Sequence, residues 1–446
     1  MLITHTRPEH LPHCAELQRV CFPTLAPEEH LTEAHIAQHL RLFPEGQFVA
    51  IETATQRVIG MTAGFRTHFD FNHTHGHTFL RAVSGGWFSR HNPHGTHYYG
   101  ADMSVHPDFR GRGLARGFHD ARKELCQGLG LKGQAVCGMI PGYAPYTRVM
   151  TAFEYVNHVV KGAIYDSTLT TQLRNGFQVR GLVANYVMDA PTRGWATVLE
   201  WRNRQHGNRP APDSLSRTHP TTGVRVGSGR GWLWSQALKS VRCGSATPRL
   251  VKRSIGVVSP RSIRARSIPQ SNFAIIWASF RKGSGWPQMR TGLLVGFTST
   301  FRIDIDFASP HLVSVYQDTD HGWFNTHTPG GAYLYGADMC ISAAFRGQGI
   351  ARAFYDLRKA LCRDLGLTGQ VVCGLIPGYS RYRREMTAFE YVNKVIAGEL
   401  HDPTLTTQLR NGFVARGLLP EYVHDDVTGG WAVLLEWRNS DRNHDQ

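Results

Sequence analysis

One long stretch of the sequence lacks acidic residues altogether: no Asp or Glu occurs from Ser214 to Ile303. Of the 49 Lys and Arg residues in the chain, 15 fall within this stretch. The 34 basic residues elsewhere equal the 34 acidic residues, so the formal net charge of +15 arises from this one segment. The charge of the remaining chain gives no reason to expect a nucleic-acid or membrane partner.

Other absences narrow the class of protein further. The eight cysteines include no C-x-x-C pair, and Cys126 and Cys137 recur among apolar neighbours as Cys362 and Cys373. This pattern is typical of buried thiols in a reducing compartment, and it favours neither disulfides nor a zinc site. No apolar run reaches the roughly 18 residues of a membrane span. The opening MLITHTRPEH lacks the apolar core of a signal peptide. We therefore expect a cytoplasmic protein.

What the chain does contain is an internal repeat. Residues 99–203 align with residues 335–439 without a gap, and about two-thirds of the positions are identical. The duplication is incomplete, because residues 1–46 have no recognisable counterpart. We predict a complete first domain at residues 1–205 and a basic segment at 206–272. A second domain without the N-terminal strand and helices follows at 273–440, with a tail at 441–446.

Three interpretations of the basic segment stay open. Its Ser, Arg, Pro and Gly content is typical of a disordered linker. A basic run could also bind a nucleic-acid backbone. The third interpretation, which we favour, is translated sequence from a decayed or frame-shifted start of the second copy, because every acidic residue disappears beside an intact repeat.

The most informative part of the repeat is a loop between an expected strand around YGADM and an expected helix. Apolar residues at Leu114, Phe118, Ala121 and Leu125 lie on one face of that helix. The first turn of a helix leaves backbone N–H groups without partners and carries positive charge, so it suits a phosphate. Glycines in the loop let an anion approach the backbone. The same pattern would also serve an ordinary strand-to-helix turn.

The spacing in this loop resembles that of a known family. Arg110-x-x-Gly113-x-Ala115 resembles the R/Q-x-x-G-x-G/A loop of GNAT-family N-acetyltransferases, and Arg346-x-x-Gly349-x-Ala351 repeats it. The longer run GWF…H-P-x-G…YGADM…RG is similar to GNAT domains fused to carbon–nitrogen hydrolases. The resemblance implies an α/β (α+β) fold, with a GNAT-like mixed, mostly antiparallel sheet flanked by helices, here duplicated.

The resemblance also implies acetyl-CoA as co-substrate and a primary amine as acceptor, without a metal. The residues expected to bind acetyl-CoA lie on the strand, the loop and the helix start of both copies: Met103, Val105, Arg110, Gly111, Arg112, Gly113, Leu114, Ala115, Arg116, Arg346, Gly347, Gly349 and Ala351. The acceptor itself cannot be identified from the sequence.

Catalytic residues are harder to assign. Many GNAT enzymes have a tyrosine as general acid where this chain has Gln172, so Tyr143, Tyr146 or Tyr186 would have to replace it. For the general base we place Asp102 first and His106 second. Asp102 could instead make a structural hydrogen bond, and His106 could be a turn residue. Copy two keeps the aspartate as Asp338.

Three alternating histidines, His73, His75 and His77, could place imidazoles on one face of a strand and bind a metal. Only His75 keeps a histidine in copy two, as His311, so we do not expect a metal site. The leading hypothesis is that copy one is the acetyltransferase and copy two is degenerate or binds only CoA. In the alternative hypothesis, both copies bind acyl-CoA as a non-catalytic sensor or scaffold.

Overall fold

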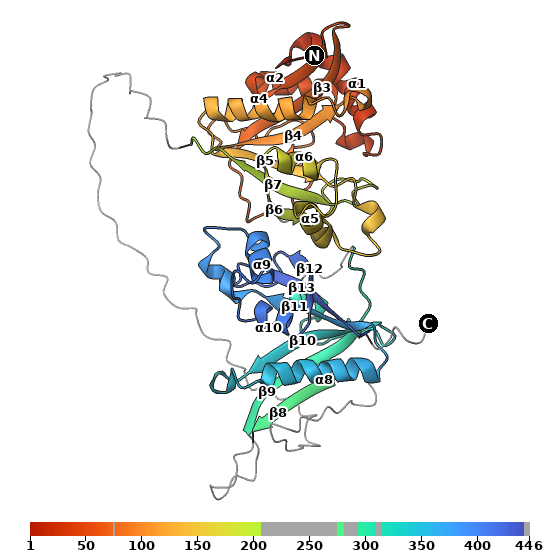
Figure 1. Cartoon of the computed structure of the whole chain (residues 1–446), viewed down its shortest axis with the longest axis vertical. Coiled ribbons are helices and arrows are strands. Elements are labelled where there is room, and N and C mark those ends of the chain that lie inside the picture. The colour runs from red at the N-terminus through yellow and green to blue at the C-terminus, as the bar shows by residue number, and fades with distance from the viewer. Residues whose placement is uncertain (75, 207–273, 281–292, 309–313, 441–446) are drawn as a thin grey trace, which may run out of the picture.

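The computed structural model describes residues 1–74, 76–206, 274–280, 293–308 and 314–440. These residues form two sheets, one for each copy of the repeat. We call residues 1–206 module one and residues 274–440 module two. The modules are stacked along the long axis of the molecule (Figure 1). Apart from residue 206 itself, the predicted basic segment at 206–272 lies outside the described residues, as does the tail at 441–446.

Module one has a seven-stranded sheet in the order β1-β2-β3-β4-β5-β7-β6. Only β4 and β5 pair in parallel, and all other neighbours are antiparallel. The strands are β1 (Leu2–His5), β2 (Phe48–Glu52), β3 (Arg57–Thr67), β4 (His97–Val105), β5 (Gly133–Met139), β6 (Gln178–Val183) and β7 (Ala196–Arg202). The α-helices are α1 (Leu11–Cys21), α2 (Glu33–Leu42), α3 (Phe79–Ala82), α4 (Leu114–Gly128), α5 (Ala152–Val160) and α6 (Leu169–Arg174). Short 3-10 turns are η1 (Pro8–His10), η2 (Pro27–Glu29), η3 (Pro44–Gly46), η4 (Pro107–Phe109) and η5 (Ala144–Tyr146).

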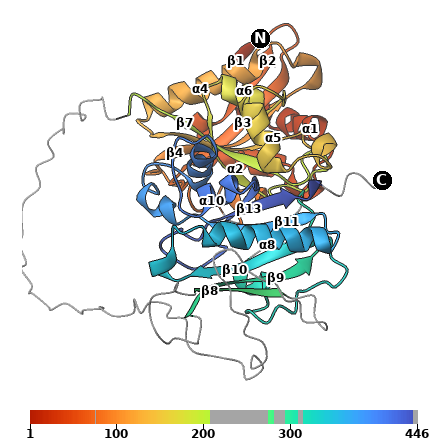
Figure 2. The same ribbon diagram turned by 60° about the horizontal axis from the view of Figure 1, so that its bottom comes forward.

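Module two repeats this arrangement with six described strands, in the order β12-β13-β11-β10-β9-β8. Its long helix α8 packs across β10 and β11 (Figure 2). Helix α4 packs on β4 and β5 in the same way. The strands are β8 (Ala274–Phe280), β9 (Leu293–Ile303), β10 (Tyr333–Ile341), β11 (Gly369–Leu375), β12 (Val414–Leu419) and β13 (Ala432–Arg438). The helices are α7 (Val315–Asp318), α8 (Ile350–Asp364), α9 (Ala388–Ile396) and α10 (Leu405–Arg410), with 3-10 turns η6 (Ala343–Phe345) and η7 (Pro377–Arg381).

Local sequence explains where several helices begin. Thr151 accepts a hydrogen bond from the backbone of Glu154, whose carboxylate accepts one from the backbone of Thr151, and this capping box starts α5. Thr387 and Glu390 do the same for α9. Near the N-terminus, Pro8–His10 forms a 3-10 turn, and α1 begins at Leu11.

The predicted fold class is confirmed. Both sheets are mixed and mostly antiparallel, helices flank them, and the element order of residues 97–202 recurs in residues 333–438. In module one, α1 packs on β3 and β4, while α4 packs on β4 and β5. Tyr99 and Ala101 of β4 belong to a core cluster that contains α1 residues, and Met103 and Val105 belong to a cluster that contains α4 residues. Strand β4 is therefore the central strand of module one, with a covering helix on each face.

Candidate active site

Strands β4 and β5 separate partway along their length. Their parallel pairing runs from His97–Gly133 to Gly100–Val136. Beyond that point β4 stays paired with β3 as far as Val105, and β5 stays paired with β7 as far as Met139. The register of β4 on β3 shifts between Gly100 and Asp102, which marks a bulge where the two strands part. The sheet thus opens into a V at the C-terminal end of β4.

Buried Arg122 of α4 holds the bulge in place. Its guanidinium donates to the carbonyl oxygens of Asp102 and Ala63, the latter at 3.2 Å. Thr62 Oγ1 also donates to the Asp102 carbonyl, at 2.7 Å. A Cβ on Gly100 would lie 2.5 Å from Arg122 Nη1, so the glycine of YGADM makes room for this arginine. Sequence reasoning missed Arg122, although the Gly–Arg pair recurs as Gly336 and Arg358.

The loop after β4 is built as an anion site requires. Gly111 and Gly113 have φ of +74° and +84°, in the left-handed region that favours glycine, and Gly113 is the N-cap of α4. A Cβ on either glycine would meet nothing within 4 Å, so their outer sides are open. Gly347 and Gly349 of module two have the same conformation and the same open surroundings. Because Gly113 is the N-cap of α4, the first-turn N–H groups and the positive end of the helix dipole lie next to this opening.

The predicted loop arginines surround this opening. Arg110 Nε donates to the Val105 carbonyl at 3.2 Å, and Arg346 makes the equivalent bond to Ile341 at the same distance. The Arg112 guanidinium lies 4.9 Å from the centre of the Phe109 ring. Arg116 follows in the first turn of α4 and is exposed. The loop and the first turn of α4 therefore carry three cationic side chains within seven residues.

The other predicted acetyl-CoA residues support the loop from below. Side chains of Met103 and Val105 pack in one cluster with Leu114 and Phe118 of α4. Ala115 precedes the exposed Arg116 in the first turn of α4 and is partly buried. In module two the repeated Ala351 also lies in the first turn of its helix, α8. The side chains of Met103 and Val105 thus fix β4 against α4, which leaves their backbone as the part able to contact a ligand.

Asp102 lies on the opposite face of β4, beneath α1. Its carboxylate accepts from Ser104 Oγ at 3.1 Å to each oxygen, and Ser104 Oγ in turn accepts from Gln18 Nε2 at 2.8 Å. Only 9% of Asp102 is exposed. Burial raises its pKa to about 6, and hydrogen bonds from Gln18 and Ser104 partly offset that rise. A carboxyl group that titrates near neutral pH suits a general base.

The corresponding aspartate of module two has different surroundings. Asp338 is exposed, and its carboxylate accepts from Ser299 Oγ at 2.9 Å. Among the described residues of module two, no helix corresponds to α1. The helix that buries Asp102 is therefore the feature that distinguishes the two aspartates.

Tyr186 lies on the same face of the sheet as Asp102, in a buried polar cluster. Its hydroxyl is 3.1 Å from that of Tyr99, which is 3.0 Å from Nε2 of His77. Burial raises the pKa of Tyr186 well above its ordinary value, so the phenol stays protonated. The pKa of Cys137, beside both tyrosines, is raised by burial to about 12. Module two repeats the tyrosine pair as Tyr335 and Tyr422.

His106 and Tyr143 have structural partners. The Nδ1 of His106 accepts from the backbone N–H of Asp108 at 3.3 Å, and its Nε2 lies 2.9 Å from Arg57. The Tyr143 hydroxyl donates to the Met150 carbonyl at 3.3 Å. Burial and the nearby Asp306 carboxylate of module two raise the pKa of Tyr143 to about 12. His106 thus caps a turn, and Tyr143 lies against the other module.

Gln172 on α6 lies directly over β5. A Cβ on Gly138 would come within 2.4 Å of Gln172 Oε1, and the equivalent contact is 2.2 Å between Gly374 and Gln408. Gln172 Oε1 and Nδ1 of nearby His119 are both buried without a hydrogen-bond partner in the structure. A small residue in β5 is therefore needed for the glutamine to lie there.

Within the described part of the chain, no three His, Cys, Asp or Glu side chains are grouped to hold a metal ion. His75 lies outside the described residues, while His73 pairs with Asp70 at 2.7 Å. Apart from Cys340, the cysteines of the described residues are free thiols. None of the described helices is both long and apolar enough to span a membrane.

Module one thus has a mixed sheet that opens between its only parallel pair of strands, beside a glycine loop at a helix N-terminus. The model of the "Acetyltransferase (GNAT) family" matches residues 11–137. The chain is 32% identical over 188 residues to "Uncharacterized N-acetyltransferase YkwB" of Bacillus subtilis, covering 42% of this chain and 82% of that protein. The chain belongs to the GNAT acetyltransferase family, which supports acyl transfer from an acyl-CoA.

A second relative is longer than the matched region. The chain is 35% identical over 204 residues to "Probable hydrolase YhcX" of Bacillus subtilis, which is 46% of this chain but only 39% of that protein. Among solved structures, the loading GNATL domain of CurA from Lyngbya majuscula matches 45% of this chain and 96% of its own at 16% identity and a TM-score of 0.39. A GphF GNAT-like decarboxylase in complex with isobutyryl-CoA matches 45% and 99%, at 19% identity and a TM-score of 0.38.

Proposed function

We propose that the protein is an N-acetyltransferase, in which module one transfers the acetyl group of acetyl-CoA to a primary amine. The observation that carries this proposal is the V between β4 and β5, flanked by the open glycine loop and the N-terminus of α4. Arg110, Arg112 and Arg116 would hold the phosphates together with the first-turn N–H groups. The β4 backbone at the bulge would hydrogen-bond the thioester carbonyl.

Asp102 is our candidate for the general base. A lysine-like amine with a pKa near 10.4 is only about 0.04% neutral at pH 7, which costs roughly 4–5 kcal/mol. A carboxylate whose pKa is about 6 can accept the proton that the amine loses. The amine nitrogen then bonds to the carbonyl carbon, the C–S bond breaks, and the thiolate leaves. Tyr186 is our candidate for the general acid that gives a proton to the leaving thiolate.

Module two keeps the phosphate loop but has Asp338 exposed and no described counterpart of α1. We therefore propose that it binds CoA at most and does not catalyse transfer. The acetyl-CoA residues of module two would be Arg346, Gly347, Gly349 and Ala351. The equal conformation of the two glycine loops also supports the rival function, in which both modules bind acyl-CoA without transfer.

Calorimetric titration of acetyl-CoA into the full chain separates these functions. We compare wild type with Arg110→Glu and its matched variant Arg346→Glu. One equivalent of binding, lost only in the Arg110 variant, is expected if module one holds the site. Two equivalents, with no transfer to any amine in a broad acceptor panel, would favour the sensor. No binding at all would refute both functions.

A further inference from the structure

The two modules contact each other through one surface that the duplication has made self-complementary. Helix α5 packs on β12 of the other module, and α9 packs on β6. One cluster of buried apolar residues contains side chains of both modules. The rings of Phe153 and its repeat equivalent, Phe389, meet edge to face at 5.5 Å. A residue that meets its own equivalent lies on a local two-fold axis, as in a symmetric dimer.

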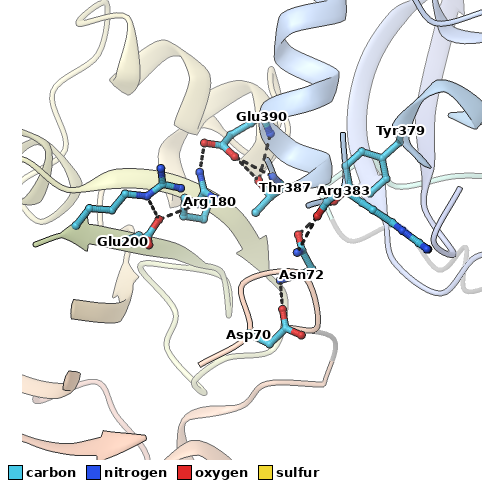
Figure 3. Close-up of polar contacts among 9 residues, drawn as sticks. Asp70, Asn72, Arg180, Glu200, Tyr379, Arg383, Thr387 and Glu390 are labelled. Carbon is cyan, nitrogen blue, oxygen red and sulfur yellow. Dashed lines mark hydrogen bonds and ion pairs between the residues drawn. The ribbon is translucent and has the colours of Figure 1, made fainter. Parts of the chain in front are cut away.

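The polar contacts across this surface are also reciprocal. Arg180 of β6 pairs with Glu390 of α9 (Figure 3). Arg416 of β12 pairs with Glu154 of α5 in the same way. Each arginine is anchored by a glutamate of its own module: Arg180 Nε lies 3.2 Å from Glu200, and Arg416 Nε 3.3 Å from Glu436.

Each arginine also lies over a phenylalanine ring of its own module. The Arg180 guanidinium is 5.8 Å from the centre of the Phe71 ring, and that of Arg416 is 5.1 Å from Phe307. Side chains of Arg180 and Arg416 are only 8% and 10% exposed. Because buried charges need partners, each arginine has one carboxylate partner in its own module and a second one in the other module.

The surface is closely packed and leaves no room for a ligand of ordinary size. The cavity between the modules has a volume of about 50 Å³ and is lined largely by aromatic and aliphatic side chains, among them Phe153, Phe389, Trp195 and Trp431. Small-molecule sites usually enclose about 300 Å³ or more. The occupant that this face fits is the other module.

One part of the contact is not reciprocal. Asn72 of module one accepts from the Tyr379 hydroxyl at 3.2 Å and donates to the Arg383 carbonyl at 3.4 Å (Figure 3). Its repeat equivalent is Ala308, whose carbonyl accepts from Trp195 Nε1 at 3.2 Å. Module two thus holds the loop that follows β3 in module one.

That loop borders the polar cluster around Tyr186. The ring of Phe69 stacks on that of Tyr99 with 5.7 Å between ring centres, and its centre lies 5.6 Å from that of the His77 ring. The ring centres of Phe71 and Phe69 are 4.8 Å apart. A chain of contacts therefore runs from Asn72 through the two phenylalanines to Tyr99. Displacing the loop would change one wall of the face on which Asp102 and Tyr186 lie.

We propose that module two takes the place that a second subunit would have in a symmetric dimer of module one. Its docking holds the loop at residues 67–74 against the face of the sheet on which Asp102 and Tyr186 lie, where the acceptor would bind. The docking surface comprises α5 and β6 of module one with α9 and β12 of module two. That this face binds the acceptor amine rests on the proposed function, whereas the docking itself does not. The docking can be measured without any substrate, so its failure and that of the proposed function are distinguishable.

The test uses the full chain with Arg180→Glu and Arg416→Glu combined. Each new glutamate would face the glutamates that now bind the arginine, so the modules should separate. The matched control combines Arg202→Glu and Arg438→Glu, because these residues pair with the same Glu200 and Glu436 but are 55% and 66% exposed. Small-angle scattering and hydrogen exchange are measured on all three proteins.

The expected result has three parts. The double variant gains a larger maximum dimension and exchanges at least tenfold faster in α5, β6, α9, β12 and residues 67–74. Exchange in α4 and β4 is unchanged, which shows that module one stays folded. The control behaves as wild type. Unchanged scattering and exchange in the double variant would overturn the proposal.

A milder pair of variants decides the question if the double variant unfolds. Glu154→Gln with Glu390→Gln keeps both capping boxes, since glutamine serves at that position, but neutralises both cross-module carboxylates. Faster exchange confined to the docking surface supports the proposal, and wild-type exchange overturns it. Asn72→Ala tests the loop: exchange should rise in residues 67–74 alone, and a wild-type rate there refutes the clamping of the loop.

Discussion

Replacing Asp102 with asparagine is expected to make the protein's stability less sensitive to pH. Burial raises the pKa of Asp102 from 3.8 to about 6, while the unfolded chain keeps the lower value. The folded state therefore binds this proton more tightly than the unfolded state does. Wild type should lose stability as pH rises from about 4 to about 6, because above that range a charged carboxylate is held under α1.

The size of the effect follows from the two pKa values. The full cost of ionising Asp102 in the folded state is about 3 kcal/mol, complete once pH exceeds about 6. Between pH 5 and pH 7.5 the unfolding free energy of Asp102→Asn should gain roughly 1–1.5 kcal/mol relative to wild type. Asparagine can still accept the hydrogen bond from Ser104, so the packing beneath α1 is preserved.

The measurement is equilibrium denaturation by urea of both proteins at the two pH values. Asp338→Asn is the matched control, because this aspartate is the repeat equivalent of Asp102 but is exposed. The control should differ from wild type by the same amount at both pH values. If Asp102→Asn also differs by a constant amount, the carboxylate is not destabilised by burial, and the argument for a base near neutral pH fails.

Three further predictions concern the site and its supports. Asp102→Asn should lower the rate of acetyl transfer by roughly 10²-fold or more with the affinity for acetyl-CoA unchanged, measured by steady-state kinetics and calorimetry; an unaltered rate would remove Asp102 from the mechanism. Gly113→Ala, at a φ of +84°, should cost about 1–2 kcal/mol of stability and weaken acetyl-CoA binding, whereas a fully stable variant would contradict the left-handed conformation. Gly138→Ala should lower stability by about 1–3 kcal/mol through its contact with Gln172, as read from thermal unfolding, and adding Gln172→Ala should restore most of it; no rescue would mean that another contact is responsible.

Local patterns predicted much of the fold. The strand before the glycine loop and the helix after it depend on residues close in sequence, and the structure has both. The resemblance of the loop to GNAT enzymes was confirmed by a family model and by relatives. The repeat then transferred each assignment from one copy to the other.

The surroundings of the candidate residues could not be predicted in this way. Asp102 is buried because α1, more than 80 residues earlier, supplies Gln18 above it. Tyr143 lies against the other module because of the docking surface, and so does its repeat equivalent Tyr379. Neither periodicity nor motif spacing contains information on contacts between segments so far apart in sequence.

Because both halves of the docking surface belong to one chain, a substitution alters only one half. In a dimer of identical chains, every substitution appears twice, and a change that helps one side must be tolerated by the other. Asn72 and Ala308 occupy equivalent positions but make different contacts, so the two halves have already diverged. Covalent fusion thus allows the two modules to specialise. One module can keep the residues that catalysis requires, while the other can lose them and still stabilise the first through the docking surface.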